Sequence, residues 1–206
     1  MELIFATGNI HKLEEARRIL GDSFTIKSPA DYGITEDIPE TSDSLKGNAM
    51  QKCRYIWEKC GKACFADDTG LFVDALNGEP GVRSARYAGE AKKSEDNIRK
   101  LLANMKNVPL EDINGKRLRT ARSICAIALI INGREYNFEG RVEGEIALAP
   151  SGEGGFGYDP LFIPSEIDGI RNFSEISPDE KNAISHRGRA MRQLEDFLKT
   201  NYDRLL

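Results

Sequence analysis

The chain has little of what zinc sites, membrane spans and nucleic-acid surfaces need. Its 206 residues include two histidines and four cysteines, and no two cysteines form a C-x-x-C pair. This spacing argues against a zinc site. The longest apolar run, Ile124 to Ile131, is too short to cross a bilayer. Lys and Arg number 29 against 33 Asp and Glu, a net charge of −4, so no basic face for nucleic acid is indicated.

The start of the sequence also lacks the marks of a signal peptide. Met1 and Glu2 give no basic start, and only Leu3 to Ala6 are apolar behind them. Cys53 and Cys60 share one helical face, as reduced core thiols of a cytoplasmic protein do. We therefore expect a cytoplasmic protein that has neither a membrane nor a nucleic acid as its partner.

The composition, 40% hydrophobic and 30% charged, is typical of a soluble globular protein of one domain. Strands are expected at 3–6, 63–66, 121–131, 134–139 and 142–147, and helices at 9–20, 45–60, 94–105 and 177–198. Asn132-Gly133 predicts a hairpin turn, and Ser177 to Glu180 a capping box. The pattern predicts an α/β fold: a mixed, elongated central sheet with flanking helices, in two lobes around a cleft.

The first candidate site is the turn Thr7-Gly8-Asn9, with Lys12 close behind it. A strand ends here and a helix begins, and the free N–H groups of a helix start favour an anion. Lys12 lies in the first helical turn, where the helix dipole disfavours a cation unless an anion is bound. The alternative is an ordinary strand-to-helix turn with an exposed lysine.

The second candidate is Asp67-Asp68-Thr69-Gly70, at the end of a buried strand. Because neighbouring strand residues point to opposite faces, both carboxylates face one site only if the strand breaks, as Gly70 suggests. Together with the acidic segment around Glu40, they would suit Mg²⁺, which prefers oxygen ligands. The alternative is an Asx turn at a strand end.

The third candidate is the glycine-rich loop from Gly152 to Pro160. It matches G-x-G-x-x-G, but Tyr158-Asp159-Pro160 follows where a dinucleotide site needs a helix, so that function is not indicated. Phe156 and Tyr158 would instead stack on a base and Asp159 would hydrogen-bond its edge. The alternative is a surface loop whose aromatic side chains plug the core beneath it.

Basic side chains form the fourth candidate. The last helix carries Lys181, His186 and Arg187, and the second helix carries Lys52 with Asn48 one turn earlier on the same face. A solvated basic helix face is the alternative. Taken together, the four candidates make up the inventory of a nucleotide site, although the chain has no G-x-x-x-x-G-K-[ST] motif and no Ser–His–Asp arrangement.

Five blocks of the sequence resemble the signatures of the inosine/xanthosine triphosphate pyrophosphatases, which act on noncanonical purine nucleotides. The blocks occur in family order and span nearly the whole chain; they are Ala6-Thr7-Gly8-Asn9-x-x-Lys12, 65–71 (FADDTGL), 84–89 (SARYAG), 154–160 (GGFGYDP) and 184–188 (ISHRG). The resemblance implies one pyrophosphatase domain over residues 1–206, with two lobes around a nucleotide cleft. It implies hydrolysis of dITP, ITP and XTP to the monophosphate and pyrophosphate, with Mg²⁺, by a homodimer.

The resemblance also implies a role for each site residue. Asp68 would be the proton acceptor and a metal ligand, and Glu40 and Asp67 would help to bind the metal. The substrate would be bound by the residues of the other blocks: Thr7, Gly8, Asn9, Lys12, Lys52, Thr69, Phe156, Gly157, Tyr158, Asp159, Lys181, His186 and Arg187. Because a metal-bound carboxylate is a weak base, Asp68 as true base and Asp68 as water positioner both stay open.

Three other functions are weighed against this one. A related enzyme acting on modified pyrimidine nucleotides is disfavoured by the purine-binding block at His186-Arg187. A nucleotide sensor without catalysis is disfavoured by the three acids at 40, 67 and 68. A nucleic-acid binder is disfavoured by the net charge of −4.

Overall fold

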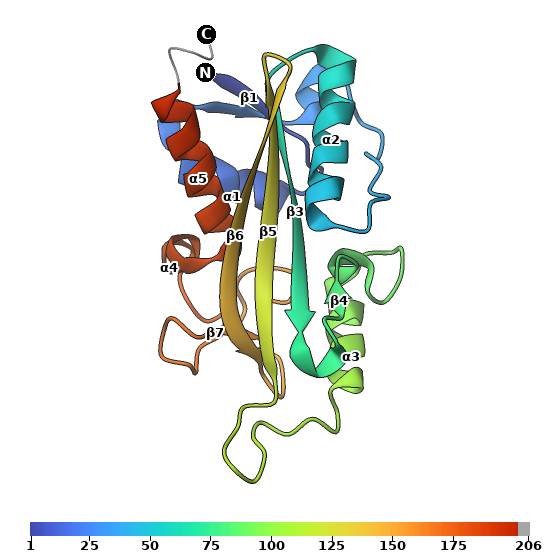
Figure 1. The fold of residues 1–206 in the computed structure, drawn as a ribbon, viewed down its shortest axis with the longest axis vertical. Coiled ribbons are helices and arrows are strands. Elements are labelled where there is room, and N and C mark those ends of the chain that lie inside the picture. The colour runs from blue at the N-terminus through green and yellow to red at the C-terminus, as the bar shows by residue number, and fades with distance from the viewer. Residues whose placement is uncertain (202–206) are drawn as a thin grey trace. The chain divides into compact units, whose positions relative to one another are not determined.

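The computed structural model describes residues 1–201 and shows a mixed α/β fold (Figure 1). The helices are α1 (Ile10–Leu20), α2 (Leu45–Cys60), α3 (Ser94–Asn104), α4 (Pro178–Ile184) and α5 (His186–Thr200). The strands are β1 (Glu2–Phe5), β2 (Thr25–Lys27), β3 (Cys64–Val73), β4 (Pro80–Gly81), β5 (Thr120–Ile131), β6 (Arg134–Ile146) and β7 (Phe162–Pro164). Among the described residues, no helix is both long and apolar enough to span a membrane.

The strands form one mixed sheet, as the sequence predicts. Their order is β2-β1-β3-β5-β6-β7, with β4 beside β3. β1 pairs in parallel with β2 and with β3, whereas β3–β4 and β6–β7 are antiparallel. Asn132 and Gly133 both have positive φ, at 50° and 71°, which is the hairpin turn expected between β5 and β6.

The chain divides into two compact units. The first contains residues 1–68, 125–140 and the described residues from Arg187 onward. Its part of the sheet is covered on both faces. One core joins α1 and α5 to Phe5, Phe65 and the odd-numbered residues of β5 from Cys125; the other joins α2 to Ile4, Cys64, Ala66 and two even-numbered residues of β5. Strand side chains alternate between the two cores because successive residues point to opposite faces.

The second unit contains residues 69–124 and 141–186. Its core includes Leu71 and Val73 of β3, Leu101 of α3 and Phe162 of β7. Arg119 is also buried there, and its guanidinium donates to the carbonyls of Met105, Val108, Ile146 and Ala147. Hydrogen bonds to four carbonyls satisfy a buried cation that would otherwise be costly.

Two predicted element boundaries are wrong. The expected strands 134–139 and 142–147 are one strand, β6, which passes through Gly140. The expected helix 177–198 is two helices, because Ser185 has extended backbone (φ −65°, ψ 155°) between α4 and α5. The capping box of Ser177 and Glu180 is present as predicted. At this break the chain passes from the second unit to the first, and Arg187 is directed to a buried carboxylate described below.

The predicted break of the second buried strand at Gly70 is also wrong. β3 continues through residues 67–70 to Val73. Glycine is needed there for a different reason: a Cβ at Gly70 would lie 2.7 Å from the carbonyl oxygen of Gly81 in β4 and 2.9 Å from the ring of Phe72. Gly70 thus permits the close approach of β4, and β3 keeps its alternation through both aspartates.

The variant Gly70→Ala tests this packing. The added methyl group has no room, so we expect the free energy of unfolding to fall by about 1–3 kcal/mol, measured from urea denaturation. Gly8→Ala is the matched control, because a Cβ at Gly8 meets nothing within 4 Å. An unfolding midpoint of Gly70→Ala equal to that of Gly8→Ala would show that the close approach is absent.

Candidate active site

The turn before α1, the first candidate site, is a capped helix start. Asn9 caps the helix, and its Oδ1 accepts from the N–H groups of His11 (3.0 Å) and Lys12 (3.3 Å). Thr7 Oγ1 accepts from the N–H of Asn9. Gly8 and Asn9 are exposed, and no acidic residue occupies the first turn of α1. An anion at this helix start would therefore meet the positive end of the helix without a competing carboxylate.

Asp67 accepts from two cations at once. Lys12 Nζ lies 2.8 Å from its Oδ1, and Arg187 Nε lies 2.9 Å from its Oδ2. The second carboxylate partner of Arg187 is Glu15, on α1. The side chains of Asp67 and Arg187 are 1% and 3% exposed, so both charges are removed from water. These contacts join α1, β3 and α5 on one face of the sheet.

The charges around Asp67 decide its protonation state. Burial alone would raise its pKa, but the positive charges of Lys12, Arg187 and Lys52 hold the pKa well below its ordinary value. Burial would likewise lower the pKa of Arg187, and the carboxylates of Asp67 and Glu15 raise it instead. Both groups are therefore ionised at neutral pH. Their mutual attraction offsets part of the free-energy cost of removing the two charges from water.

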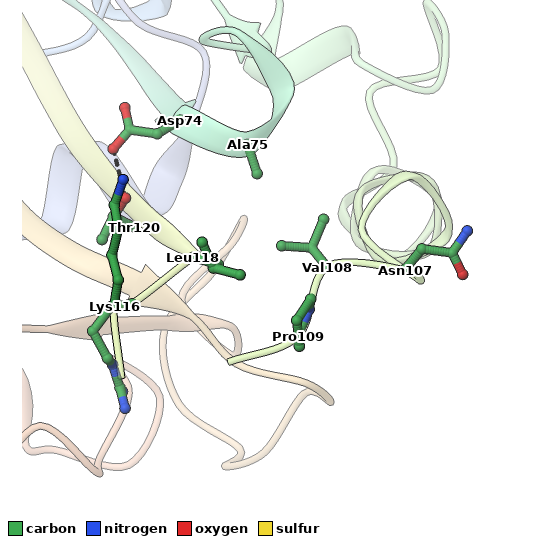
Figure 2. Close-up of a pocket in the computed structure, with 9 residues that line it drawn as sticks. Asp74, Ala75, Asn107, Val108, Pro109, Lys116, Leu118 and Thr120 are labelled. Atoms are coloured by element: carbon green, nitrogen blue, oxygen red, sulfur yellow. Dashed lines mark hydrogen bonds between the residues drawn. The ribbon is translucent and has the colours of Figure 1, made fainter. Parts of the chain in front are cut away.

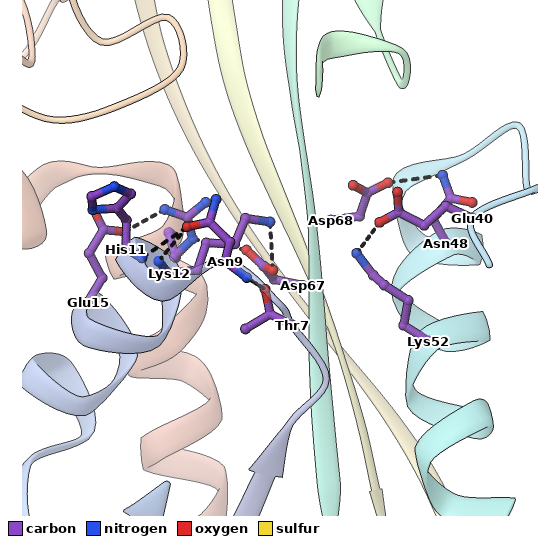
Figure 3. Close-up of polar contacts among 11 residues, drawn as sticks. Thr7, Asn9, His11, Lys12, Glu15, Glu40, Asn48, Lys52, Asp67 and Asp68 are labelled. Atoms are coloured by element: carbon purple, nitrogen blue, oxygen red, sulfur yellow. Dashed lines mark hydrogen bonds and ion pairs between the residues drawn. The ribbon is translucent and has the colours of Figure 1, made fainter. Parts of the chain in front are cut away.

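Asp68 lies on the opposite face of β3, toward α2 (Figure 3). Asn48 Nδ2 donates to its Oδ2 at 3.0 Å. Lys52, one turn farther along α2, pairs with Glu40. Burial raises the pKa of Asp68, and Lys52 and Lys12 offset part of this effect. Burial also opposes the charge on Lys52, but Asp68, Asp67 and Glu40 raise its pKa above the ordinary value.

The two faces of β3 thus hold different groups. Phe65 and Asp67 lie on the face of α1 and α5, and Ala66 and Asp68 on the face of α2. Within residues 1–201, no three His, Cys, Asp or Glu side chains form a metal-binding group. Glu40 and Asp68 are brought to the same side. Lys12 contacts one carboxylate oxygen of Asp67 and Arg187 contacts the other. The part of Asp67 in metal binding stays a prediction.

The second unit gathers the predicted aromatic loop and Lys181. Asp159 Oδ2 accepts from Lys181 Nζ at 2.7 Å and from the N–H of Phe156 at 2.8 Å. The ammonium of Lys181 also lies 4.6 Å from the centre of the Phe156 ring. Gly155 is required beside them, because it has a φ of 73° and a Cβ there would lie 2.2 Å from Asp159 Oδ2. The loop is therefore folded around an ion pair.

Tyr158 fastens this loop to another sequence block. Its hydroxyl donates to the carbonyl of Ser84 at 2.8 Å, and burial raises its pKa. Ser84 Oγ in turn accepts from the N–H of Leu71 and donates to the carbonyl of Gly81. The block that begins at Ser84, to which the sequence alone assigned no role, thus supports the aromatic loop.

The remaining predicted residues lie as follows. Thr69 lies on β3 directly after Asp68, Gly157 lies in the aromatic loop, and His186 opens α5. Glu15 and Asn48 also contact the predicted set and were given no role by sequence reasoning. Glu15 lies three residues after Lys12 in one helix, and this spacing is the signal that could have found it.

A pocket of about 390 Å³ lies elsewhere in the second unit (Figure 2). None of the predicted site residues lines it; its lining residues are Asp74, Ala75, Asn107, Val108, Pro109, Lys116, Arg117, Leu118 and Thr120. Asp74 is bound there by Thr120 and Arg122. This pocket therefore adds no residue to the candidate active site.

Comparison with known sequences identifies the family of the chain. The sequence profile of the Ham1 family matches residues 3–197. The chain belongs to the Ham1 family. It is 48% identical to the dITP/XTP pyrophosphatase of Porphyromonas gingivalis over 197 residues, which cover 96% of this chain and 97% of that protein. It is 44% identical to the dITP/XTP pyrophosphatase of Bacillus subtilis, with 96% and 97% covered.

Solved structures of Ham1 proteins share the fold. The Ham1 protein of Staphylococcus aureus superposes with a TM-score of 0.84 at 35% identity, covering 98% of this chain and all of that one. A dITP/XTP pyrophosphatase of Mycobacterium abscessus superposes with a TM-score of 0.73 at 42% identity, covering 94% and 98%. The family resemblance and the fold class inferred from the sequence are both confirmed.

The buried ion pairs of Asp67 predict a strong effect on stability. In Asp67→Asn, Lys12 and Arg187 lose a buried counter-charge, and we expect the free energy of unfolding at pH 7 to fall by about 3–5 kcal/mol. Folding lowers the pKa of Asp67. The difference in the free energy of unfolding between the variant and the wild type should therefore shrink as pH falls below about 3.9, where Asp67 of the unfolded chain becomes protonated.

Urea denaturation of both proteins across this pH range measures the effect. Asp74→Asn is the control, because the pair of Asp74 with Arg122 is exposed and should contribute about 1 kcal/mol or less. Equal losses in the two variants would contradict the role given to Asp67.

Proposed function

We propose that this Ham1 protein hydrolyses noncanonical purine nucleoside triphosphates (dITP, ITP and XTP) to the monophosphate and pyrophosphate, and so removes such bases from the precursors of DNA and RNA. The observation that carries the proposal is the division of charges across β3. Asp67 holds cations beside the anion site of α1, and Asp68 lies with Glu40, Asn48 and Lys52 on the other face. The relatives named dITP/XTP pyrophosphatase support the substrate class.

The triphosphate is assigned to the helix start and the lysines. Thr7, Gly8 and Asn9 lie at the start of α1, whose positive end favours an anion, and Lys12 follows in its first turn. Lys52 and Lys181 add positive charge, and each now neutralises a carboxylate, Glu40 and Asp159 respectively. Such donors stabilise the charge that develops on phosphate oxygens, and one of them is commonly worth about 10²–10³ in rate.

Asp68 and Glu40 fit a magnesium ion. Both are carboxylates on the α2 side of β3 (Figure 3), and Mg²⁺ is usually bound by one or two carboxylates together with substrate phosphates and water. Glu40 would reach the ion by giving up Lys52, and Asp67 only by giving up Lys12 or Arg187. When bound, the ion would supply positive charge to the phosphate oxygens and acidify water.

The reaction is the attack of one water molecule on the α-phosphorus. The oxygen of the water bonds to that phosphorus, the bond to the bridging oxygen breaks, and pyrophosphate leaves with the electron pair. Asp68 orients the water, and two routes stay open for its proton: transfer to Asp68, or release from a water that the bound metal would acidify. Asn48 Nδ2 donates a hydrogen bond to Oδ2 of the Asp68 carboxylate.

Base recognition is assigned to the aromatic loop and to the start of α5. Phe156 and Tyr158 offer rings, Asp159 offers a carboxylate, and Gly157 gives the loop its turn, with φ at 63°. His186 and Arg187 would address the 6-keto edge of the purine. A 6-amino group would leave such donors without an acceptor, and mismatches of this kind discriminate strongly.

The remaining proposals concern the state of the protein in the cell. We propose a cytoplasmic homodimer with no nucleic-acid or membrane partner. All four cysteines are free thiols, which fits a reducing compartment. Trp57 is partly buried against the core beneath α2, and a second copy would cover its exposed part.

Thr69, which follows Asp68 on β3, is the last of the proposed substrate contacts.

A substrate panel tests the proposed function. The protein is incubated with Mg²⁺ and either dITP, XTP, dATP, dGTP or dUTP, and pyrophosphate and orthophosphate are assayed separately. We expect kcat/KM for dITP and XTP to exceed that for dATP and dGTP by at least about 10², the discrimination expected of unpaired donors. Equal rates contradict the specificity, orthophosphate contradicts the cleavage position, and faster turnover of dUTP favours a pyrimidine enzyme.

Removing the charge of Asp68 tests its place in the reaction. Asp68→Asn keeps the size of the side chain, so we expect the fold to persist and kcat for dITP to fall by about 10³ or more. Circular dichroism and the melting temperature confirm the fold. A kcat within a few-fold of the wild type would reject Asp68 as the residue that acts on the water.

A further inference from the structure

The side chain of Asn48 lies between two elements of the candidate active site. It is fully buried on α2. Its Nδ2 donates to Asp68 Oδ2 at 3.0 Å, and its Oδ1 accepts from the N–H of Ser42 at 2.8 Å. Ser42 follows Glu40 by two residues. One amide group therefore joins the aspartate on β3 to the segment that carries Glu40 (Figure 3).

This segment is seated closely on α2. Gln51 also binds it, since its Oε1 accepts from the N–H of Thr41 at 2.9 Å and its Nε2 donates to Thr41 Oγ1 at 3.0 Å. Gly47 makes room for the contact, because a Cβ there would lie 1.9 Å from Ser42 Oγ. Asn48 and Gln51 thus share the task of holding the segment, but only Asn48 of these two contacts Asp68 in the described structure.

An amide is the group that these two contacts require. A carboxylate at position 48 would still accept from Ser42, but it would face the carboxylate of Asp68 with no proton to donate. A small apolar side chain would make neither bond. Asn48 itself is 0% exposed, and only a side chain with a donor and an acceptor about one carbon apart satisfies both partners from this position.

We propose that Asn48 is a positioning residue for the hydrolytic reaction: it fixes the orientation of the Asp68 carboxylate and its spacing from Glu40. The inference rests on the proposed function, because it gives Asn48 a part in the same reaction. Asn48 acts through Asp68 and does not touch the substrate. Its loss should therefore lower kcat and leave substrate affinity nearly unchanged.

Two variants of Asn48 and one of Gln51 separate this role from a structural one. Asn48→Asp keeps the bond to Ser42 and loses the bond to Asp68, Asn48→Ala loses both, and Gln51→Ala loosens the segment without touching Asp68. The measurements are kcat and KM for dITP with Mg²⁺, the Kd of an α,β-methylene dITP analogue by calorimetry, and the melting temperature.

We expect both Asn48 variants to lose about 10–100-fold in kcat, the usual effect of removing a group that orients a ligand or catalytic side chain. Their KM, and the Kd of the analogue, should stay within about 3-fold of the wild type, and Gln51→Ala should keep kcat within about 3-fold. If Asn48→Asp does not fold, Asn48→Ala compared with Gln51→Ala gives the answer.

Two results would overturn the proposal alone, and a third would overturn the proposed function as well. A kcat of Asn48→Asp near that of the wild type would show that Asn48 only holds the segment. An equal loss of kcat in Gln51→Ala and Asn48→Ala would show the same. A wild-type protein that releases no pyrophosphate from dITP would contradict the proposed function itself, and the role of Asn48 with it.

Discussion

The alternation of side chains along β3 is the constraint on which the candidate active site depends. Because the strand runs without a break from Cys64 to Val73, Asp67 and Asp68 must point to opposite faces of the sheet. Two adjacent carboxylates that would repel each other on one face are thereby separated by the sheet. The helices that cover each face then supply the polar contacts of the aspartate on that face.

The separation gives the two acids different tasks. On one face, Asp67 neutralises Lys12 and Arg187 and so binds β3 to α1 and α5. On the other, Asp68 is held by a neutral amide, and burial keeps its pKa raised. A carboxylate already matched by two cations is suited to organising a site. One that lies beside an amide and a second acid is suited to binding a cation or receiving a proton.

Local sequence signals predicted most helices and the longer strands, but they missed the short strands β2, β4 and β7 and the tertiary partners of the elements. The caps of α1 and α4 and the turn at Asn132-Gly133 were found because turn and cap chemistry lies within a few residues. The break at Gly70 was predicted wrongly because a glycine in a strand has two explanations, a break or the close approach of another backbone. Only the position of Gly81 on β4 decides between them.

The same limit applies to the site. Motif residues were located from their spacing, since a family signature fixes which side chains must be present. Glu15 and Asn48 were given no role because their partners, Arg187 and Asp68, are distant in sequence. Ser185 broke the last predicted helix, although the apolar spacing of that helix continues through it. Such contacts depend on how helices pack against the sheet, which no local pattern specifies.

The division of tasks across β3 can be observed directly with a metal that scatters X-rays anomalously. Crystals of the protein would be soaked with Mn²⁺ and the α,β-methylene analogue of dITP, and the anomalous difference map would locate the ion. The account predicts Mn²⁺ bound by Asp68 and Glu40, with Asp67 still paired to Lys12 and Arg187. An ion bound by Asp67, with Lys12 or Arg187 displaced, would contradict it.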